Sequence, residues 1–281
     1  MASVKNAVLK VVVQTTRSLA HVEDVATFGR IMSGSAPNLA PRKYGSTQPL
    51  KGELNYLAIE EQLKHVYSGN GEDVLFGCGN PVAGYMNFDA AKGVRAWSNG
   101  FHGTWDFSSA VNYLHEAHAV LREGALAYNA AYAGMSVGGG NFASVNIQDP
   151  RQNFGVVNGI VVPPVSISGI QALHGICWVN IFGEKYIEFF ERSLLAKVPC
   201  YKSEFLDNGR YFLFQVTEHP EEMFAEHGVK LTNQIREVLG HPRAFQDYPR
   251  PVAEKRIPPW LLEFEAPSFD FSELRIPSHP V

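Results

Sequence analysis

The chain has 281 residues, of which 45% are hydrophobic, 12% aromatic and 19% charged, and its formal net charge is −4. This balance is typical of a globular protein with a substantial core, folded as one large domain or two small ones. The net charge argues against a surface that binds nucleic acid or anionic membranes, and it favours a basic partner over an acidic one.

The cysteines and the N-terminal residues indicate in which cellular compartment the protein is expected. The three cysteines, Cys78, Cys177 and Cys200, are widely spaced and form no C-x-x-C pair, so we expect neither a disulfide framework nor a structural zinc site. Lys10 interrupts the short apolar run near the N-terminus, which argues against a secretory signal. No stretch approaches the roughly 20 apolar residues that span a membrane. We therefore expect a cytoplasmic protein without a membrane segment.

Strand-like stretches dominate the first 107 residues. They are residues 8–15, which are rich in valine, 73–78, 83–88 and 93–107. Glycines punctuate the last three stretches and predict an antiparallel meander with turns or bulges. Helical spacing of apolar residues predicts helices over 22–32 and 54–67, separated by a Pro/Gly loop that includes 41–45.

Helical patterns dominate much of the second half. A long helix is predicted from a cap at Ser108 or Ser109 to an end near Gly134. Its apolar positions recur at helical steps: Val111, Leu114, Leu121, Ala125, Tyr128 and Tyr132. A buried strand is expected over 176–182, followed by an amphipathic helix over 185–197.

A β-hairpin is predicted over 200–217. Asn208 and Gly209 suit a type I′ turn, because both central positions of that turn need a positive φ. The turn pairs Phe205 with Phe212 and Ser203 with Phe214. One face of the hairpin is then apolar, and its residues are Tyr201, Phe205, Phe212, Phe214 and Val216. We expect a helix over 221–239 to pack on this face.

The composition changes beyond residue 245. Prolines recur through 246–281 and prevent regular structure, yet large apolar side chains such as Trp260 and Phe264 do not suit a free tail. We expect an extended arm that lies across the body. The fold class is therefore α+β, with antiparallel sheet packed by amphipathic helices in a body of residues 1–245. Two similar lobes, 1–107 and 108–245, are one arrangement of that body.

Residues 134–138 match the G-x-S-x-G pattern that presents a nucleophilic serine, Ser136 here, and Asp149 and His174 follow in hydrolase chain order. Such a serine must lie between a strand and a helix. The residues before Ser136 predict a helix and the glycines after it break one, so a glycine-rich helix exit is the expected structure. The same glycines match a dinucleotide fingerprint, G-x-G-x-x-A, again without the strand and helix that it needs.

His115 and His118 lie three residues apart on the predicted long helix, with His102 as a candidate third metal ligand. The H-E-x-x-H motif of metalloproteases places its histidines four apart instead. His118 falls on the apolar stripe between Leu114 and Leu121, which favours a hydrogen-bonded core histidine. We therefore expect no catalytic residue, no metal site and no cofactor.

Two stretches carry a resemblance to a known family. One is residues 41–50, PRKYGSTQPL, and the other runs from 174–190, HGICWVNIFGEKYIEFF, through the hairpin to residue 240. Together they resemble bacterial immunity proteins encoded beside polymorphic toxins, including type VI secretion effectors. That pattern has a P-x-x-Y-G-x-x-E-P loop, a tryptophan strand, an F-G-x-x-Y helix start and a late G-x-x-x-F element. Gln48 occupies the position of the acid in the first of these.

The resemblance implies a function without catalysis. An immunity protein binds one cognate toxin tightly and blocks it, so the expected partner is a protein toxin and no small-molecule substrate is expected. A cytoplasmic location implies a toxin that acts there, such as a nuclease or a nucleotide-consuming enzyme. We place the toxin contact on the arm at Trp260, Glu263, Phe264 and Glu265, which combine aromatic anchors with acidic charge. Capping of the protein's own core is the alternative role of the arm.

Two other functions stay open from the sequence. A serine- or metal-dependent hydrolase with an atypical site predicts a deep polar pocket at Ser136 or at the His115 and His118 pair. A structural component of a phage or secretion apparatus predicts homo-oligomers and exposed apolar edges.

Overall fold

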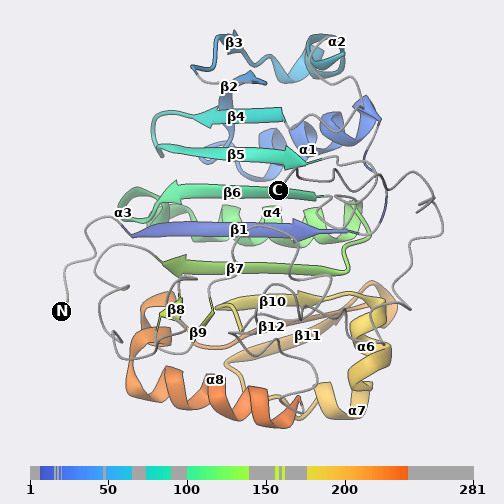
Figure 1. Ribbon diagram of the computed structural model, residues 1–281, viewed down its shortest axis with the longest axis vertical. Helices are drawn as coiled ribbons and strands as arrows, with labels where there is room; N and C mark the ends of the chain where they lie inside the picture. The colour runs from blue at the N-terminus through green and yellow to red at the C-terminus, as the bar shows by residue number, and fades with distance from the viewer. Residues whose placement is uncertain are drawn as a thin grey trace, which may run out of the picture.

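The computed structural model describes residues 7–15, 17, 19, 21–46, 49–64, 74–89, 100–138, 156–157, 160–161 and 176–239. Most of the strands among them form one antiparallel sheet of ten strands, in the order β11-β12-β10-β7-β1-β6-β5-β4-β2-β3 (Figure 1). A separate small sheet pairs β8 (Val156–Val157) with β9 (Ile160–Val161). The predicted α+β class with an antiparallel sheet is confirmed.

The first six strands form one end of the large sheet. They are β1 (Val8–Gln14), β2 (Pro41–Gly45), β3 (Gly52–Glu53), β4 (Val74–Cys78), β5 (Gly84–Asp89) and β6 (Gly100–Asp106). β4, β5 and β6 pair consecutively, as the predicted meander requires. The expectation of a loop over 41–45 was wrong, because these residues pair with β4. The strand tolerates Pro41 because a proline without an amide hydrogen fits the first position of a strand.

One face of the sheet is covered by the helices of the first half. They are α1 (Val22–Ser35), η1 (Tyr56–Ala58), α2 (Ile59–Leu63), α3 (Phe107–Ala110), η3 (Val111–Tyr113) and α4 (Leu114–Ala127). Phe28 of α1 packs on three rings of the sheet, those of Phe76, Phe88 and Phe101. α4 approaches so closely at Gly124 that an added Cβ would lie 2.7 Å from the ring of Phe101. Of the helix predicted over 54–67, the structure describes residues 54–64, and these contain two short helices, η1 and α2.

The predicted long helix ends earlier than expected. α4 ends at Ala127, Asn129 takes a φ of 51°, and Tyr132–Gly138 form the strand β7, buried along its whole length. Tyr128 and Tyr132 are four residues apart, which is a helical spacing, but Tyr132 belongs to the strand and not to the helix. The N-cap was predicted at Ser108 or Ser109, whereas it is Asp106, whose side chain accepts a hydrogen bond from the amide of Ser109.

The second half adds β10 (Val179–Phe182), β11 (Lys202–Leu206) and β12 (Tyr211–Gln215). The hairpin of β11 and β12 has the predicted register, with Phe205 opposite Phe212 and Ser203 opposite Phe214. Its turn lies in η6 (Asp207–Gly209), where Asn208 has a φ of 54° and Gly209 one of 88°. The hairpin prediction is confirmed.

Two predicted helices are each divided in two. Residues 185–197 form α6 (Glu184–Phe190) and α7 (Arg192–Leu195), with a break at Glu191, where φ is 63°. Residues 221–239 form η7 (Pro220–Phe224) and α8 (Glu226–Val238), because Ala225 is extended.

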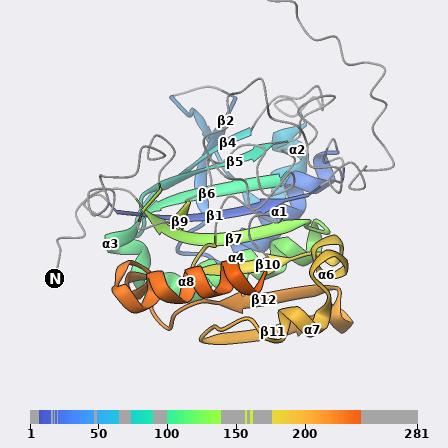
Figure 2. The same cartoon turned by 60° about the horizontal axis from the view of Figure 1, so that its bottom comes forward.

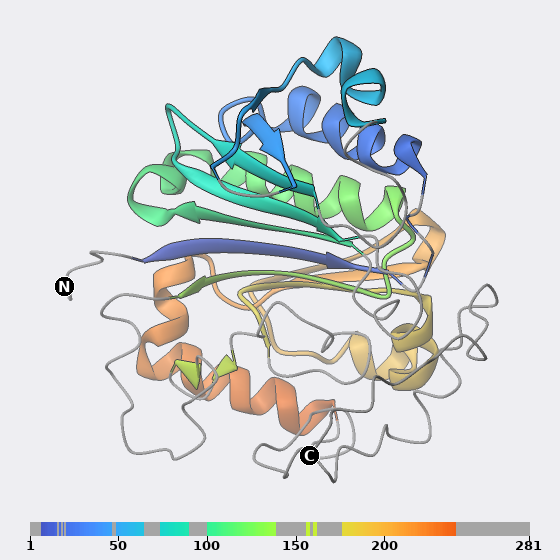
Figure 3. The ribbon, with the colours of Figure 1, turned by 45° about the horizontal axis from the view of Figure 1, so that its top comes forward.

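The aromatic face of the hairpin packs on α6. Phe182 at the end of β10 contacts Tyr186 and Phe190 of α6 on one side and Phe214 on the other. The ring contacts of this face therefore run through Phe182 to α6. The packing of the last helix on the same face stays a prediction. α6 and α8 lie on the side of the sheet opposite α1 and α4 (Figure 3).

The sheet is continuous across the two ranges proposed as lobes. The central strand β1 pairs with β6 on one side and with β7 on the other. The division of the body at residues 107 and 108 and the boundary near 245 stay predictions. None of the described helices combines the length and apolar character needed to cross a membrane.

Candidate protein-binding site

The residues that the sequence placed in the toxin contact, Trp260, Glu263, Phe264 and Glu265, lie outside the described residues, as do Asp149 and His174. Their roles stay predictions.

Ser136 lies within a strand. It is in β7 opposite Lys10 of β1, and its side chain is 6% exposed. The G-x-S-x-G residues are consecutive strand positions, so they do not form the sharp strand-to-helix turn that presents a catalytic serine. The expected helix exit is not present either, because β7 replaces the end of the helix.

The three histidines do not converge. His118 of α4 packs edge-on against Trp178 with 5.2 Å between ring centroids, whereas His115 is exposed. Burial, together with the nearby charge of Lys202, lowers the pKa of His118 to about 4. Phe101 faces α4, so its neighbour His102 faces the other side of the sheet. Within the described ranges, no group of three metal-binding side chains gathers.

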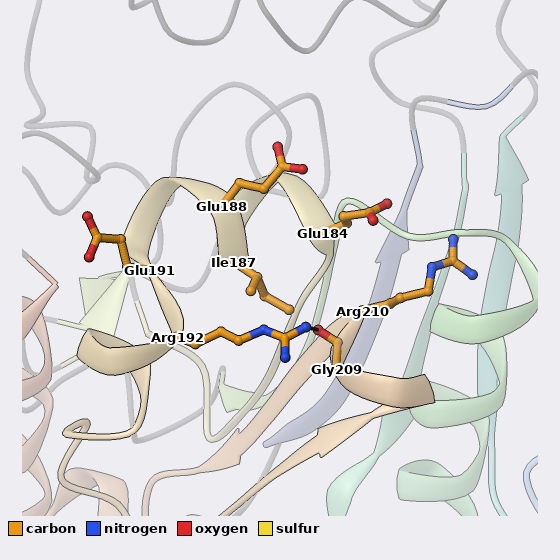
Figure 4. Close-up of a pocket in the computed structure, with 7 residues that line it drawn as sticks. All are labelled: Glu184, Ile187, Glu188, Glu191, Arg192, Gly209 and Arg210. Carbon is orange, nitrogen blue, oxygen red and sulfur yellow. Dashed lines mark hydrogen bonds between the residues drawn. The ribbon is translucent and has the colours of Figure 1, made fainter.

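A pocket lies where the corner between α6 and α7 meets the hairpin turn. It has a volume of about 310 Å³ and is lined by Glu184, Ile187, Glu188, Glu191, Arg192, Gly209 and Arg210. Figure 4 shows the carboxylates of Glu184, Glu188 and Glu191 directed outward from α6 and its C-terminal end, while the guanidinium of Arg192 extends towards Gly209. The pocket therefore has an acidic outer rim.

Arg192 joins the two sides of this corner. Its Nη2 donates a hydrogen bond of 3.0 Å to the carbonyl oxygen of Gly209, and its guanidinium lies 5.7 Å from the ring centroid of Phe205. Positive φ values at Glu191 and Gly209 bring the helix corner and the turn together. The backbone conformation on both sides thus positions one arginine against the aromatic edge of the sheet.

The charges of the corner are unevenly compensated. Arg210 pairs with Asp207 at 3.1 Å and donates a hydrogen bond to Asn129, and Lys185 pairs with Glu188 at 3.1 Å. In the part of the chain that the structure describes, Glu184 and Glu191 have no ion-pair partner. Two exposed carboxylates are therefore available to a positively charged partner.

An aromatic edge adjoins the pocket. β11 is the last strand at this end of the described sheet, and Figure 2 shows α7 beside it. Phe205 on this strand is 40% exposed, and Tyr201, which precedes it on the same face, is 55% exposed. Exposed aromatic side chains beside an arginine are the residue types enriched in protein interfaces.

The corner is suited to recognition. Among the described residues, its lining contains carboxylates, guanidinium groups, one apolar side chain and a backbone carbonyl, which are groups that form ion pairs and hydrogen bonds with a partner. The sequence indicated the turn and the aromatic hairpin face, but it gave no sign that β11 is an edge strand or that the helix breaks at Glu191.

Comparisons with known proteins extend this description. No protein-family model matches the sequence, and no curated protein matches it significantly. A similar solved structure is the Pseudomonas aeruginosa T6SS protein PA0821, with a TM-score of 0.48 and 9% sequence identity over 83% of this chain and 72% of that one.

Proposed function

We propose that this protein is an immunity protein that neutralises a cognate toxin acting in the cytoplasm by forming a stoichiometric complex. The observation that carries the proposal is the corner at β11, where the exposed ring of Phe205 lies beside Arg192 and the acidic rim, and exposed Tyr201 lies farther along the same face of the strand. The resemblance of residues 41–50 and 174–240 to toxin immunity proteins supports the same function. Of the predicted functions, a protein binder is the one that uses this surface.

The partner proposed for the corner is a basic protein surface. Tyr201 and Phe205 supply apolar area with few rotatable bonds, so little conformational entropy is lost when a partner covers them. Glu184 and Glu191 attract basic side chains, which raises the rate of association at low salt. A toxin with lysine or arginine side chains around its active site, such as a nuclease, fits this chemistry.

Co-expression tests the proposal. The toxin is sought among the products of the reading frames adjacent to this gene, and each candidate is produced from an inducible promoter in a bacterial host. The wild-type protein should restore growth, and the double variant Tyr201→Ala/Phe205→Ala should restore it poorly. Leu57→Ala is the matched control, because Leu57 is a 98% exposed apolar residue at the other end of the sheet. Equal protection by the double variant, at equal protein level, would remove the corner from the interface.

The C-terminal arm is a second predicted contact. A chain that lacks 246–281 separates the two roles proposed for Trp260, Glu263, Phe264 and Glu265. A soluble, folded truncate that protects as well as the full chain removes the arm from the interface. A folded truncate that binds the toxin weakly keeps it there.

A further inference from the structure

A row of polar side chains crosses the middle of the sheet on the face opposite α1 and α4. Lys10 of β1 is the cross-strand neighbour of Thr104 on β6 and of Ser136 on β7. Directly paired residues share a face, and their Cβ atoms lie about 5 Å apart. The long side chain of Lys10 therefore rises between two hydroxyl groups.

Among the described residues, neither the ammonium of Lys10 nor the hydroxyls of Thr104 and Ser136 make a hydrogen bond or an ion pair. Thr104 and Ser136 are each 6% exposed, and burial lowers the pKa of Lys10. In the part of the chain that the structure describes, no polar atom of these three side chains is both buried and unsatisfied, so this cluster of donors stays open to an external acceptor.

In the described strands and helices, no carboxylate forms an ion pair with Lys10. Tyr85, His102 and Asp106 are the nearest titratable residues on the same face of β5 and β6. The carboxylate of Asp106 is occupied by the hydroxyls of Ser108 and Ser109. Of the described helices, α6 and α8 lie towards the β10 end of the sheet (Figures 1 and 3), and η7, which carries Glu221 and Glu222, contacts β7.

We propose that Lys10, Thr104 and Ser136 form a binding site for a single oxyanion group, a phosphate or a carboxylate, of a small molecule. Lys10 supplies the positive charge, and the two hydroxyls donate hydrogen bonds to its oxygen atoms. The site is on the central strands, whereas the proposed toxin contact is at the β11 edge. It is thus a function beyond toxin binding and does not depend on it.

Calorimetric titration of the full-length protein with inorganic phosphate, and separately with acetate, tests the site. Saturable one-to-one binding of either anion is expected, and the anion that binds more tightly identifies the class of ligand. Lys10→Met should weaken binding by about tenfold or more, as expected for loss of a charge-assisted contact. Lys230→Met, which removes an exposed lysine of α8, should leave it unchanged. Absence of saturation with both anions, or unchanged binding by folded Lys10→Met, overturns the proposal.

A second measurement uses the wild-type protein and so avoids any loss of folding. Lysine acetylation by an N-hydroxysuccinimide ester is followed by mass spectrometry with and without the saturating anion. The bound anion should slow acetylation of Lys10 and leave that of Lys230 unchanged. Equal rates at Lys10 with and without the anion contradict the site.

Discussion

Arg192 lies over the ring of Phe205, with 5.7 Å between its guanidinium carbon and the ring centroid, and it holds the hairpin turn through the carbonyl of Gly209. This arrangement connects α7, which follows a break in the chain at Glu191, to the edge strand of the sheet. A residue that fixes an exposed aromatic side chain reduces the entropy that a partner must remove on binding. This order supports the proposed role of the corner in binding a partner.

Gly209→Ala should destabilise the protein by about 1–3 kcal/mol, through the strain of a positive φ and loss of an arginine contact. The φ of Gly209 is 88°, and an added Cβ would lie 2.6 Å from Nη2 of Arg192. Gly34→Ala is the control, because no atom lies within 4 Å of that Cβ in α1. It should be neutral or stabilising by less than about 1 kcal/mol. Urea unfolding of both variants checks this, and equal stability would argue against the described turn.

Asn180 should be required for folding stability. It is fully buried in β10, where its side chain bonds the amide and the carbonyl of Cys177 and accepts a hydrogen bond from Tyr132. Asn180→Ala leaves these buried groups without partners, so we expect a loss of about 2–4 kcal/mol in the free energy of unfolding. Tyr132→Phe removes a single hydroxyl and should lose about 1 kcal/mol. A loss for Asn180→Ala no larger than that for Tyr132→Phe would contradict the network.

His118 predicts a pH dependence of stability. Its pKa in the folded protein is about 4, below the value of 6.5 for an ordinary histidine. Between these values the unfolded chain binds more protons than the folded one, so stability falls as pH decreases from about 6.5 towards 4. The loss from this residue is at most about 3 kcal/mol. Denaturant unfolding at several pH values should show this slope reduced in His118→Gln and retained in His115→Gln, which alters an exposed histidine of the same helix.

Charge at the corner should act mainly on the rate of association. Glu184→Gln/Glu191→Gln removes two unpaired carboxylates, so toxin binding should slow several-fold at low salt and much less at high salt. Glu60→Gln/Glu61→Gln removes two carboxylates from α2, at the other end of the sheet, and is the matched control. Stopped-flow association at two ionic strengths checks this. Equal slowing by both pairs would mean that net charge, and not the corner, sets the rate.

The local sequence was sufficient to predict some of the strands and turns. The register of β11 and β12 follows from Asn208 and Gly209, because their backbone preference fixes the turn and the turn fixes the pairing. The valine-rich β1 and the β4-β5-β6 meander were predicted equally well. These elements depend on residues close together in the chain.

Other features depend on contacts between distant segments. The small residues of β7 are compatible with a helix end, and only pairing with β1 and β10 makes them a strand. The candidate site was missed for the same reason, because exposure of Phe205 follows from the place of β11 at the edge of the sheet. Lys10 interrupted an apolar run in the sequence, and only the strand register places it beside Ser136.

We propose that the protein neutralises its toxin by binding and blocking it, and not by catalysing a reaction on it. The most direct test is a titration of the toxin's activity against increasing amounts of the purified protein, after long and short incubation. Inhibition should grow linearly and become complete at one molecule of this protein per toxin, independent of incubation time. Complete and time-dependent loss of toxin activity at amounts far below equimolar would show turnover and contradict the account.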